Sequence, residues 1–386
     1  MGYPGLQTLN AHYWTEGRCG WRVLDGRYEG GSVRKASTAE ARKAQTMTGI
    51  DVNTFLTMIY TMIDDWYQQE IAAQKPVRPG QDPVVSDREV LTLTILREWL
   101  GCTSEEHFLA VVTQHGQGYV PRVRCQSSFN RRVRDLWGVL VVWAPLAGQW
   151  VTALQDVSAY RVADAVPGPL MRVCRGRRHR VFGPEADLGC GGSDKDRYYG
   201  VKLLVEITQQ GAITGFILGP AGTNERWLLE ALLRYRADPA APPPTEAEAQ
   251  TFLGPSHKRG GRPVGPTGPL GPRGGVGTAA PADLGDLGFS GAAWQQHWLA
   301  AYGTAVLTKD AYPDRRDKAT FCHYRQIIET VHGFRTDRLH LAFPRVRTLA
   351  GLYARLAAKL ATYSFMLVDN LLHQRPTFSQ PLPQLD

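Results

Sequence analysis

The chain has 386 residues, of which 43% are hydrophobic and 21% charged, and this balance excludes a disordered chain. Its length suffices for two or three domains. The formal net charge of +8 and the isoelectric point near 9.2 favour polyanionic partners, with nucleic acid ahead of anionic membrane. No secretory signal is visible, and no apolar run reaches the roughly 20 residues of a membrane span. We therefore expect a cytoplasmic protein without a membrane partner.

The six cysteines are scattered along the chain, which indicates a reducing compartment and not a disulfide framework. Cys174, His179 and Cys190 lie close enough in sequence to suggest a zinc site. There is no C-x-x-C pair and no fourth ligand in register, so zinc is the weaker hypothesis here.

The N-terminal part of the chain is predicted to be helical. Residues 1–48 show no sustained hydrophobic period and are predicted to form a loosely ordered arm. The alternative is that the start of the chain is placed too early and that Met47 is the first residue. Residues 49–150 carry helical patterns, among them a capping box from Ser86 to Glu89. We interpret them as a helical DNA-binding domain, because arginines crowd its last helix.

From residue 151 the pattern changes to strands mixed with helices. Alternating segments at 158–166, 198–208 and 212–220 predict three strands, and Asn224 caps a helix after them. Gly and Pro dominate residues 237–281, which predicts a flexible insertion, either a solvated loop or a mobile arm that contacts DNA.

After the insertion, strand and helix patterns alternate to the end of a second predicted domain, residues 151–375. A strand ends in a turn within 282–291, and long helices are expected at 318–334 and 345–372. The tail, 376–386, carries three prolines and is predicted to be loose. The fold class is therefore α/β.

Three carboxylates stand at boundaries of these elements. Asp164 lies in the first strand, Asp286 at the end of the strand after the insertion, and Glu329 in a late helix. Ordinary roles compete: Asp164 could be a turn residue near Pro167, Asp286 competes with Asp283, and Glu329 could simply pair with Arg325 at i,i+4. Asp156 and Asp187 are weaker alternatives.

Six motifs in this order resemble those of DDE-type insertion-sequence transposases: SDREVLTLTILREWLG, SSFNRRVRDL, RVADAVPGPLMRV, YYGVKLLVEIT, LGDLGFSG and YRQIIETVHGF. The resemblance covers residues 87–372 without the insertion. It implies a ribonuclease-H-like mixed sheet flanked by helices, and Asp164, Asp286 and Glu329 as the catalytic metal ligands. The implied activity is cleavage of element ends and strand transfer into double-stranded target DNA, by a homodimer associated with a prokaryotic nucleoid.

The resemblance also implies Mg²⁺, with Mn²⁺ as a substitute. Mg²⁺ prefers carboxylate oxygens, and two ions about 4 Å apart clamp an in-line displacement at phosphorus. Arg325 is in register with an accessory arginine of these enzymes. Cys322 and Thr336 stand where the family has Tyr and Lys, which leaves those two roles open.

Clusters of arginines are the candidate DNA contacts, because guanidinium binds phosphate bidentately. They are Arg131, Arg132 and Arg134 in the helical domain, Arg175, Arg177, Arg178 and Arg180 after the first strand, and Arg335 and Arg338 after Glu329. A solvated basic face is the alternative for each. Periodicity does not decide whether Lys202 points toward the site. Two rival functions remain, a nuclease of the same fold and an inactive, domesticated DNA-binding protein.

Overall fold

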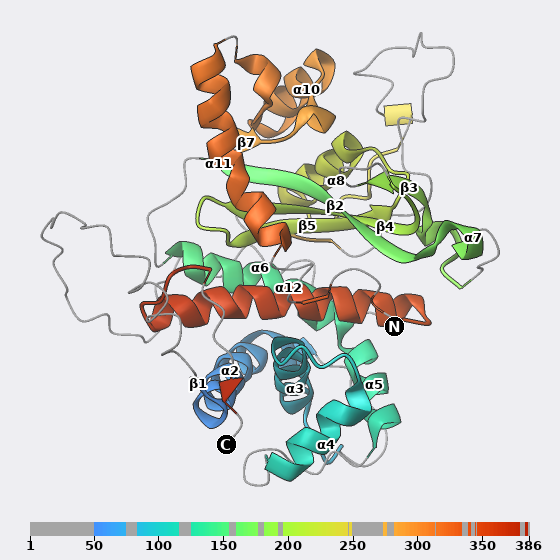
Figure 1. Ribbon diagram of the computed structural model, residues 1–386, viewed down its shortest axis with the longest axis vertical. Coiled ribbons are helices and arrows are strands. Elements are labelled where there is room, and N and C mark those ends of the chain that lie inside the picture. Colours follow the sequence, from blue (N-terminus) through green and yellow to red (C-terminus); the bar gives the residue numbers. More distant parts are fainter. Residues whose placement is uncertain are drawn as a thin grey trace, which may run out of the picture.

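A seven-stranded mixed sheet lies at the centre of the computed structural model (Figure 1). The structure describes residues 50–74, 83–115, 125–153, 160–176, 181–191, 196–245, 247–248, 273–275, 282–312, 314–333, 339–340, 344, 346–378 and 383–384. The predicted N-terminal arm and the alternative start Met47 lie outside these residues. No described helix has the length and apolar character that crossing a membrane requires.

The strand order is β6-β5-β4-β2-β7-β8, with β3 paired to β4. The strands are β2 (Arg161–Arg172), β3 (Asp187–Gly191), β4 (Asp196–Thr208), β5 (Ile213–Pro220), β6 (Arg273–Gly275), β7 (Ala282–Leu284) and β8 (Ala305–Leu307). From β6 to β2 neighbouring strands are antiparallel, whereas β7 and β8 run parallel to β2. The expected α/β class is confirmed in this coarse form.

Helices cover both faces of the sheet. On one face lie α6 (Trp137–Ala153), α11 (Arg315–Gly333) and α12 (Leu349–Leu372), and on the other α8 (Glu225–Ala237) and α10 (Ala292–Tyr302). Strand alternation divides the side chains between them. Val162 and Leu203 pack with the first group, and Ala163 and Leu204 with the second.

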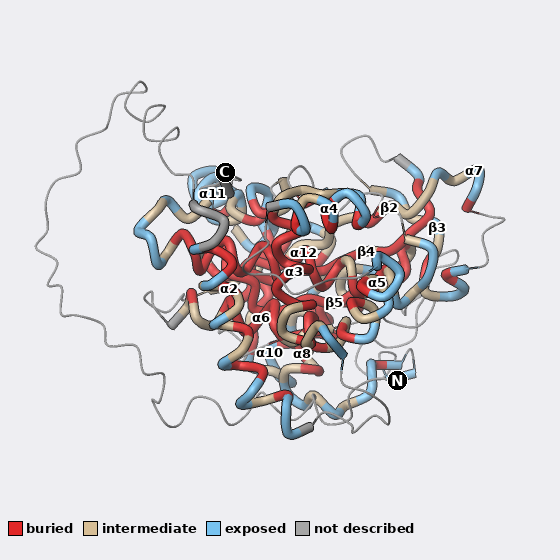
Figure 2. Tube along the Cα trace, turned by 90° about the horizontal axis from the view of Figure 1, so that it is seen from below, coloured by how far each residue is buried: buried red, intermediate tan, exposed pale blue. Residues whose placement is uncertain are grey.

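The N-terminal helices pack on the side of α12 that faces away from the sheet (Figure 1). They are α2 (Val52–Trp66), continued by a π-helical turn Tyr67–Ile71 and a 3₁₀ turn Ala72–Gln74, α3 (Asp87–Trp99), α4 (Glu105–His115) and α5 (Gln126–Asp135). One continuous cluster of buried side chains runs from α2 through α12 to the sheet, and Figure 2 shows it around α3, α6, α12 and β5. The predicted division near residue 150 therefore crosses a shared core.

The predicted capping box at Ser86–Glu89 and the predicted cap at Asn224 are confirmed. Ser86 and Glu89 form the capping box of α3, and Gly101 ends that helix with φ +66°. Asn224 caps α8, and Gly211 turns the β4–β5 hairpin with φ +81°. These signals depend on neighbours in the chain, which is why the sequence alone reveals them.

Three segments differ from the expectation. Residues 273–275, within the predicted flexible insertion, form β6 and pair with β5, because Gly274 lets the strand approach Phe216 and Val141 closely. Most of the insertion lies outside the described residues. The tail is not loose throughout, since β9 (Pro383–Gln384) pairs in parallel with β1 (Ile50–Asp51). Strand β2 continues through Pro167, which was a candidate turn position. At Pro167 only β4 pairs with β2, so the backbone N–H that proline lacks is not needed for pairing with a second strand.

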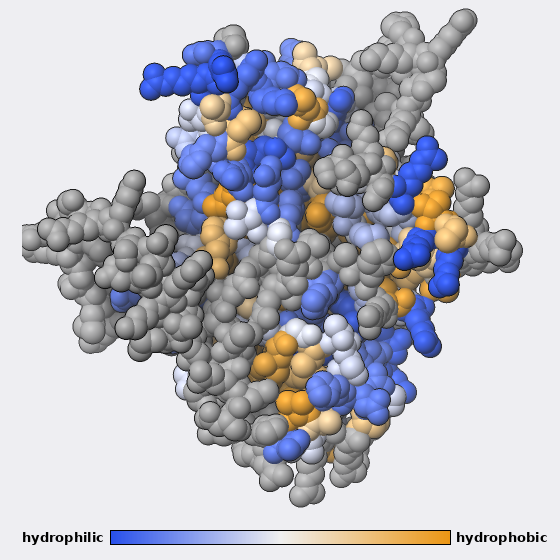
Figure 3. Space-filling model, viewed as in Figure 1, coloured by the Kyte–Doolittle hydropathy of each residue, from blue (hydrophilic) through white to orange (hydrophobic). Residues whose placement is uncertain are grey.

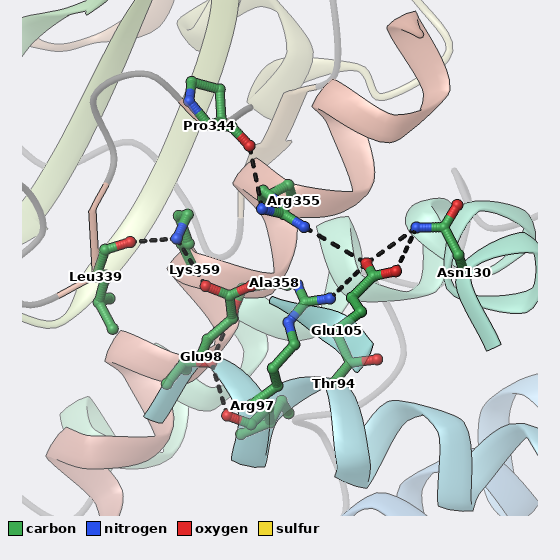
Figure 4. Close-up of polar contacts among 12 residues, drawn as sticks. Thr94, Arg97, Glu98, Glu105, Asn130, Leu339, Pro344, Arg355, Ala358 and Lys359 are labelled. Carbon is green, nitrogen blue, oxygen red and sulfur yellow. Dashed lines mark hydrogen bonds and ion pairs between the residues drawn. The ribbon is translucent and has the colours of Figure 1, made fainter. Parts of the chain in front are cut away.

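A buried ion pair joins the N-terminal helices to α12. Lys359 Nζ donates to Glu98 Oε2 at 2.6 Å, and also to the carbonyl oxygen of Leu339 (Figure 4). Arg97 contacts the other oxygen of Glu98. Burial alone would raise the pKa of Glu98, but the charges of Arg97 and Lys359 lower it from 4.5 to about 2. The carboxylate is therefore ionised in the folded protein at neutral pH.

We predict that Lys359→Met lowers the free energy of unfolding by about 3 kcal/mol at pH 7, because it leaves a buried carboxylate short of one partner. Ionised Glu98 stabilises the fold above about pH 4.5, and this contribution is lost as the pH falls toward 2. The deficit of the variant should therefore shrink at pH 3. Urea denaturation at both pH values measures it, with exposed Lys318→Met as the control. Equal deficits at both pH values would contradict this account.

Candidate active site

Asp164 lies in β2, and Asp286 lies two residues beyond the end of the neighbouring parallel strand β7. Arg161 lies opposite Asp283, and Val162 opposite Leu284. The β2–β7 pairing ends at Leu284, and beyond it the negative charge of Asp164 still acts on the carboxyl group of Asp286. Side chains alternate along a strand, so Asp164 projects to the face that carries Val162, the face on which α11 contacts β2.

Asp286 follows β7 and directly precedes a 3₁₀ turn. Its Oδ1 accepts the backbone N–H of Gly288 at 2.8 Å and so caps the 3₁₀ turn Leu287–Phe289. Burial raises the pKa of Asp286, and the negative charge of Asp164 raises it further, against the opposing effects of the Gly288 N–H, Arg325 and Lys202. The two aspartates therefore repel each other, and a cation between them would relieve that repulsion.

Asp164 is held by two side chains of α11. Arg325 Nη2 lies 3.5 Å from its Oδ2, and His332 Nε2 lies 3.3 Å from the same oxygen. Burial would raise the pKa of Asp164, but the hydrogen bond and charge of His332 and the charge of Arg325 hold it below its ordinary value. Asp164 is therefore a carboxylate at neutral pH.

Glu329 sits one helical turn after Arg325 and contacts it, with Oε1 at 3.6 Å from Nη1. One guanidinium thus bridges Asp164 and Glu329. The side chain of Glu329 is 61% exposed, and within the described part of the chain no three His, Cys, Asp or Glu side chains gather closely enough to hold a metal ion. Glu329 therefore pairs with Arg325 at i,i+4 and is linked to Asp164 only through that guanidinium.

His332 was not predicted from the sequence. Arg325, Glu329 and His332 follow one another at i, i+4 and i+7, the spacing that puts side chains on one helix face. That spacing was a visible signal. Only the fold shows that this face looks onto β2.

Lys202 and Glu225 form a second pair at the rim of the site. Lys202 Nζ donates to the carbonyl oxygen of Thr223 at 3.0 Å and lies 3.4 Å from Glu225 Oε1. A methyl group at Gly288 would lie 2.0 Å from Glu225 Oε2 and 2.8 Å from Asp286 Oδ1, so the two carboxylates face the same point. Burial raises the pKa of Glu225, Lys202 lowers it, and Asp286 and Asp164 raise it. The side chain of Lys202, whose direction the sequence left open, therefore points toward Glu225 at the start of α8.

Carboxylate oxygens are the ligands that hard divalent cations prefer in proteins. Asp164 and Asp286 offer carboxylate oxygens, and the carboxylate of Glu225 occupies the space beside Gly288, close to Asp286. Arg325 supplies the positive charge that faces Asp164 in this structure.

The predicted basic contacts of the helical part have different surroundings. Arg131 is exposed on α5, whereas Arg132 donates to Asp87 and to the carbonyl oxygen of Val85, which anchors α5 against α3. Arg134 is half-buried, and its Nε donates to the carbonyl oxygen of Asn130 at 3.4 Å. Of the three, Arg131 is the most open to a polyanion.

The remaining candidates lie elsewhere or beyond the described residues. Arg175 is exposed on the short helix α7 (Val173–Gly176), at the far end of β2 from Asp164, and Asp187 begins β3. Cys174 and Cys190 are exposed and form no disulfide. The residues outside the described segments are Asp156, Arg177, Arg178, His179, Arg180, Arg335 and Arg338.

No family model, no curated protein and no solved structure matches this chain.

We predict that Gly288→Ala couples energetically to Glu225. The added methyl group overlaps the Glu225 carboxylate, the end of a flexible side chain, and also crowds Asp286. In the wild-type protein Gly288→Ala should lower the free energy of unfolding by about 1–2 kcal/mol. In the Glu225→Ala background, where the space is empty, the same substitution should cost about 1 kcal/mol less. A double-mutant cycle of urea denaturation measures the coupling. Strict additivity would show that the two residues do not share this space.

Proposed function

We propose that the protein is a DDE-type DNA transposase that cleaves the ends of a mobile element and joins them to target DNA. The observation that carries the proposal is the electrostatic pair of Asp164 in β2 and Asp286 just beyond the parallel strand β7, with Arg325 and His332 of α11 in contact with Asp164. The strand order supports it, since antiparallel β5-β4-β2 followed by parallel β7 and β8 is compatible with a ribonuclease-H-like sheet.

In this proposal Asp164, Asp286 and Glu329 hold Mg²⁺, or Mn²⁺ in its place. When bound, the ions would polarise the scissile phosphodiester and stabilise the leaving 3′ oxygen. Arg325 positions two of the three acids, because its guanidinium contacts both Asp164 and Glu329. His332 orients Asp164 from the next turn of the same helix.

Double-stranded DNA is the proposed substrate and target. The net charge of +8 supports a polyanionic partner, and hydrophilic side chains gather over the part of the surface where α10 and α11 lie (Figure 3). Exposed Arg131 and Arg175 would contact the phosphate backbone. Transposition requires two element ends to be held together, so we propose a homodimer on DNA, at the nucleoid of a prokaryotic cytoplasm.

One observation favours a second candidate, a DNA-binding protein that no longer cleaves. Glu329 is exposed and paired with Arg325, apart from the two aspartates. A nuclease of the same fold without strand transfer is the third outcome that the experiment below distinguishes.

We predict that the purified protein, with Mg²⁺ and a labelled DNA carrying the inverted repeats that flank its gene, yields nicked and joined products. Asp164→Asn should lower cleavage at least about a thousandfold while DNA binding persists, because the substitution removes a ligand and leaves the fold intact. Nicking without joining would indicate a nuclease, and binding alone a regulator. Cleavage that survives Asp164→Asn would exclude this site.

A matched pair of variants tests which glutamate serves the reaction. We expect Glu329→Gln to lower cleavage at least about a hundredfold, because it removes the third proposed metal ligand. Glu225→Gln keeps its hydrogen-bonding shape beside Lys202 and should change cleavage less than about tenfold. Rates are measured at several Mg²⁺ concentrations. The reverse order of effects would assign the third acid to Glu225.

A further inference from the structure

A polar cavity of about 450 Å³ lies where α3, α4 and α5 meet the N-terminal end of α12. None of the residues placed in the candidate active site lines it. Its polar lining includes Arg97, Glu105, Asn130, Arg134, Arg347 and Arg355. Helices from the N-terminal and the C-terminal parts of the chain therefore line this cavity together, and it is separate from the carboxylates of the candidate active site.

The lining carries an excess of positive charge. Arg97, Arg134, Arg347 and Arg355 face two acids, Glu105 and Glu106. This balance disfavours a metal cation, and the polar walls disfavour an apolar ligand. An anion is the occupant that the charges favour.

Glu105 is fully engaged by the walls of the cavity (Figure 4). Its Oε1 lies 2.7 Å from Arg97 Nη1 and 3.4 Å from Arg355 Nη2, and Asn130 Nδ2 donates to both of its oxygens at 2.9 and 2.8 Å. Gln126 Nε2 adds a bond of 2.7 Å to Oε2. The carboxylate therefore holds the arginines in place and is saturated.

Donor capacity remains after Glu105 is satisfied. The side chain of Arg97 is only 2% exposed, and its Nε has no hydrogen-bond partner among the described residues. Arg347 is exposed at the cavity and directly precedes Thr348, whose Oγ1 caps α12 by accepting the N–H of Gly351 at 3.1 Å. The positive end of this 24-residue helix adds to the potential of the arginines.

We propose that this cavity binds a phosphate group, with Arg134 and Arg347 as the residues that contact it and Arg97 and Arg355 as the fixed wall behind them. Guanidinium groups and a helix N-terminus are the donors that phosphate accepts best in proteins. The phosphate could be carried by a nucleic-acid backbone or be free in solution, and the experiment separates these sources. The proposal does not depend on the proposed transposase activity.

The test titrates inorganic phosphate into the full-length protein by calorimetry, without divalent metal and at constant ionic strength set with chloride. Wild type should show saturable binding of one phosphate per chain. Arg347→Gln should weaken it about tenfold or more, because it removes a charge-assisted hydrogen bond. Arg316→Gln removes the same charge from an exposed position on α11 outside the cavity and should change the affinity less than twofold. Arg134→Gln serves as the second variant if Arg347→Gln fails to fold.

A duplex oligonucleotide identifies the source of the phosphate. If the duplex displaces inorganic phosphate and Arg347→Gln weakens duplex binding, the cavity holds a backbone phosphate. If phosphate binds and the duplex does not displace it, the ligand is a free phosphate compound. No saturable phosphate binding, or equal effects of Arg347→Gln and Arg316→Gln, would overturn the proposal. Asp164→Asn should bind phosphate as wild type does, so loss of cleavage and loss of this site are distinguishable.

Discussion

The parallel pairing of β2 with β7 is the constraint on which the candidate site depends. It brings β7, and Asp286 two residues beyond its end, next to the strand that carries Asp164. Two like charges that share a partly buried position destabilise each other, and the pKa of Asp286 is raised accordingly by burial and by Asp164. The fold offsets part of this cost from outside the sheet, since Arg325 and His332 reach Asp164 from α11. A site that carries such repulsion is unusual for a purely structural role, because apolar residues at these strand ends would be more stable.

A second constraint is the packing around α12. This helix packs against α6 and against α3, and its buried Lys359 reaches Glu98. Removing two charges from water costs several kcal/mol per ion, and direct contact with additional hydrogen bonds repays it only in one geometry. The pair therefore specifies one arrangement of the N-terminal helices on α12 more than it adds stability. The same arrangement closes the arginine-lined cavity, because Arg97 and Arg355 come from the two sides of this junction.

Much of the fold could be predicted from the sequence where the signal is local. Alternation revealed β2, β4 and β5, and caps revealed α3 and α8, because these patterns involve residues within a turn or a pleat of each other. The failures share a different cause. β3 and β6 are short and rich in glycine, and they exist because β4 and β5 offer them paired edges. The sequence also suggested that α6 belongs with the helices before it. Its Gly148 instead approaches the backbone of Ile213 in β5, where any Cβ would collide, and no local pattern reports that contact.

The site shows the same limit. The LGDLGFSG motif pointed to Asp286, and the structure supplies its reason: the Gly288 N–H donates to Asp286, and Glu225 fills the space where a side chain at Gly288 would stand. Lys202 remained undecided because strand alternation allows either face, and its contact with Glu225 is set by how α8 begins after β5. Arg132 belongs to a basic run in the sequence, yet its partner Asp87 is 45 residues away and turns it into a packing residue. Residue type and spacing thus indicate what a side chain can do. The role of a side chain depends on which partner it contacts in the folded protein, and that partner is set by contacts between elements far apart in the chain.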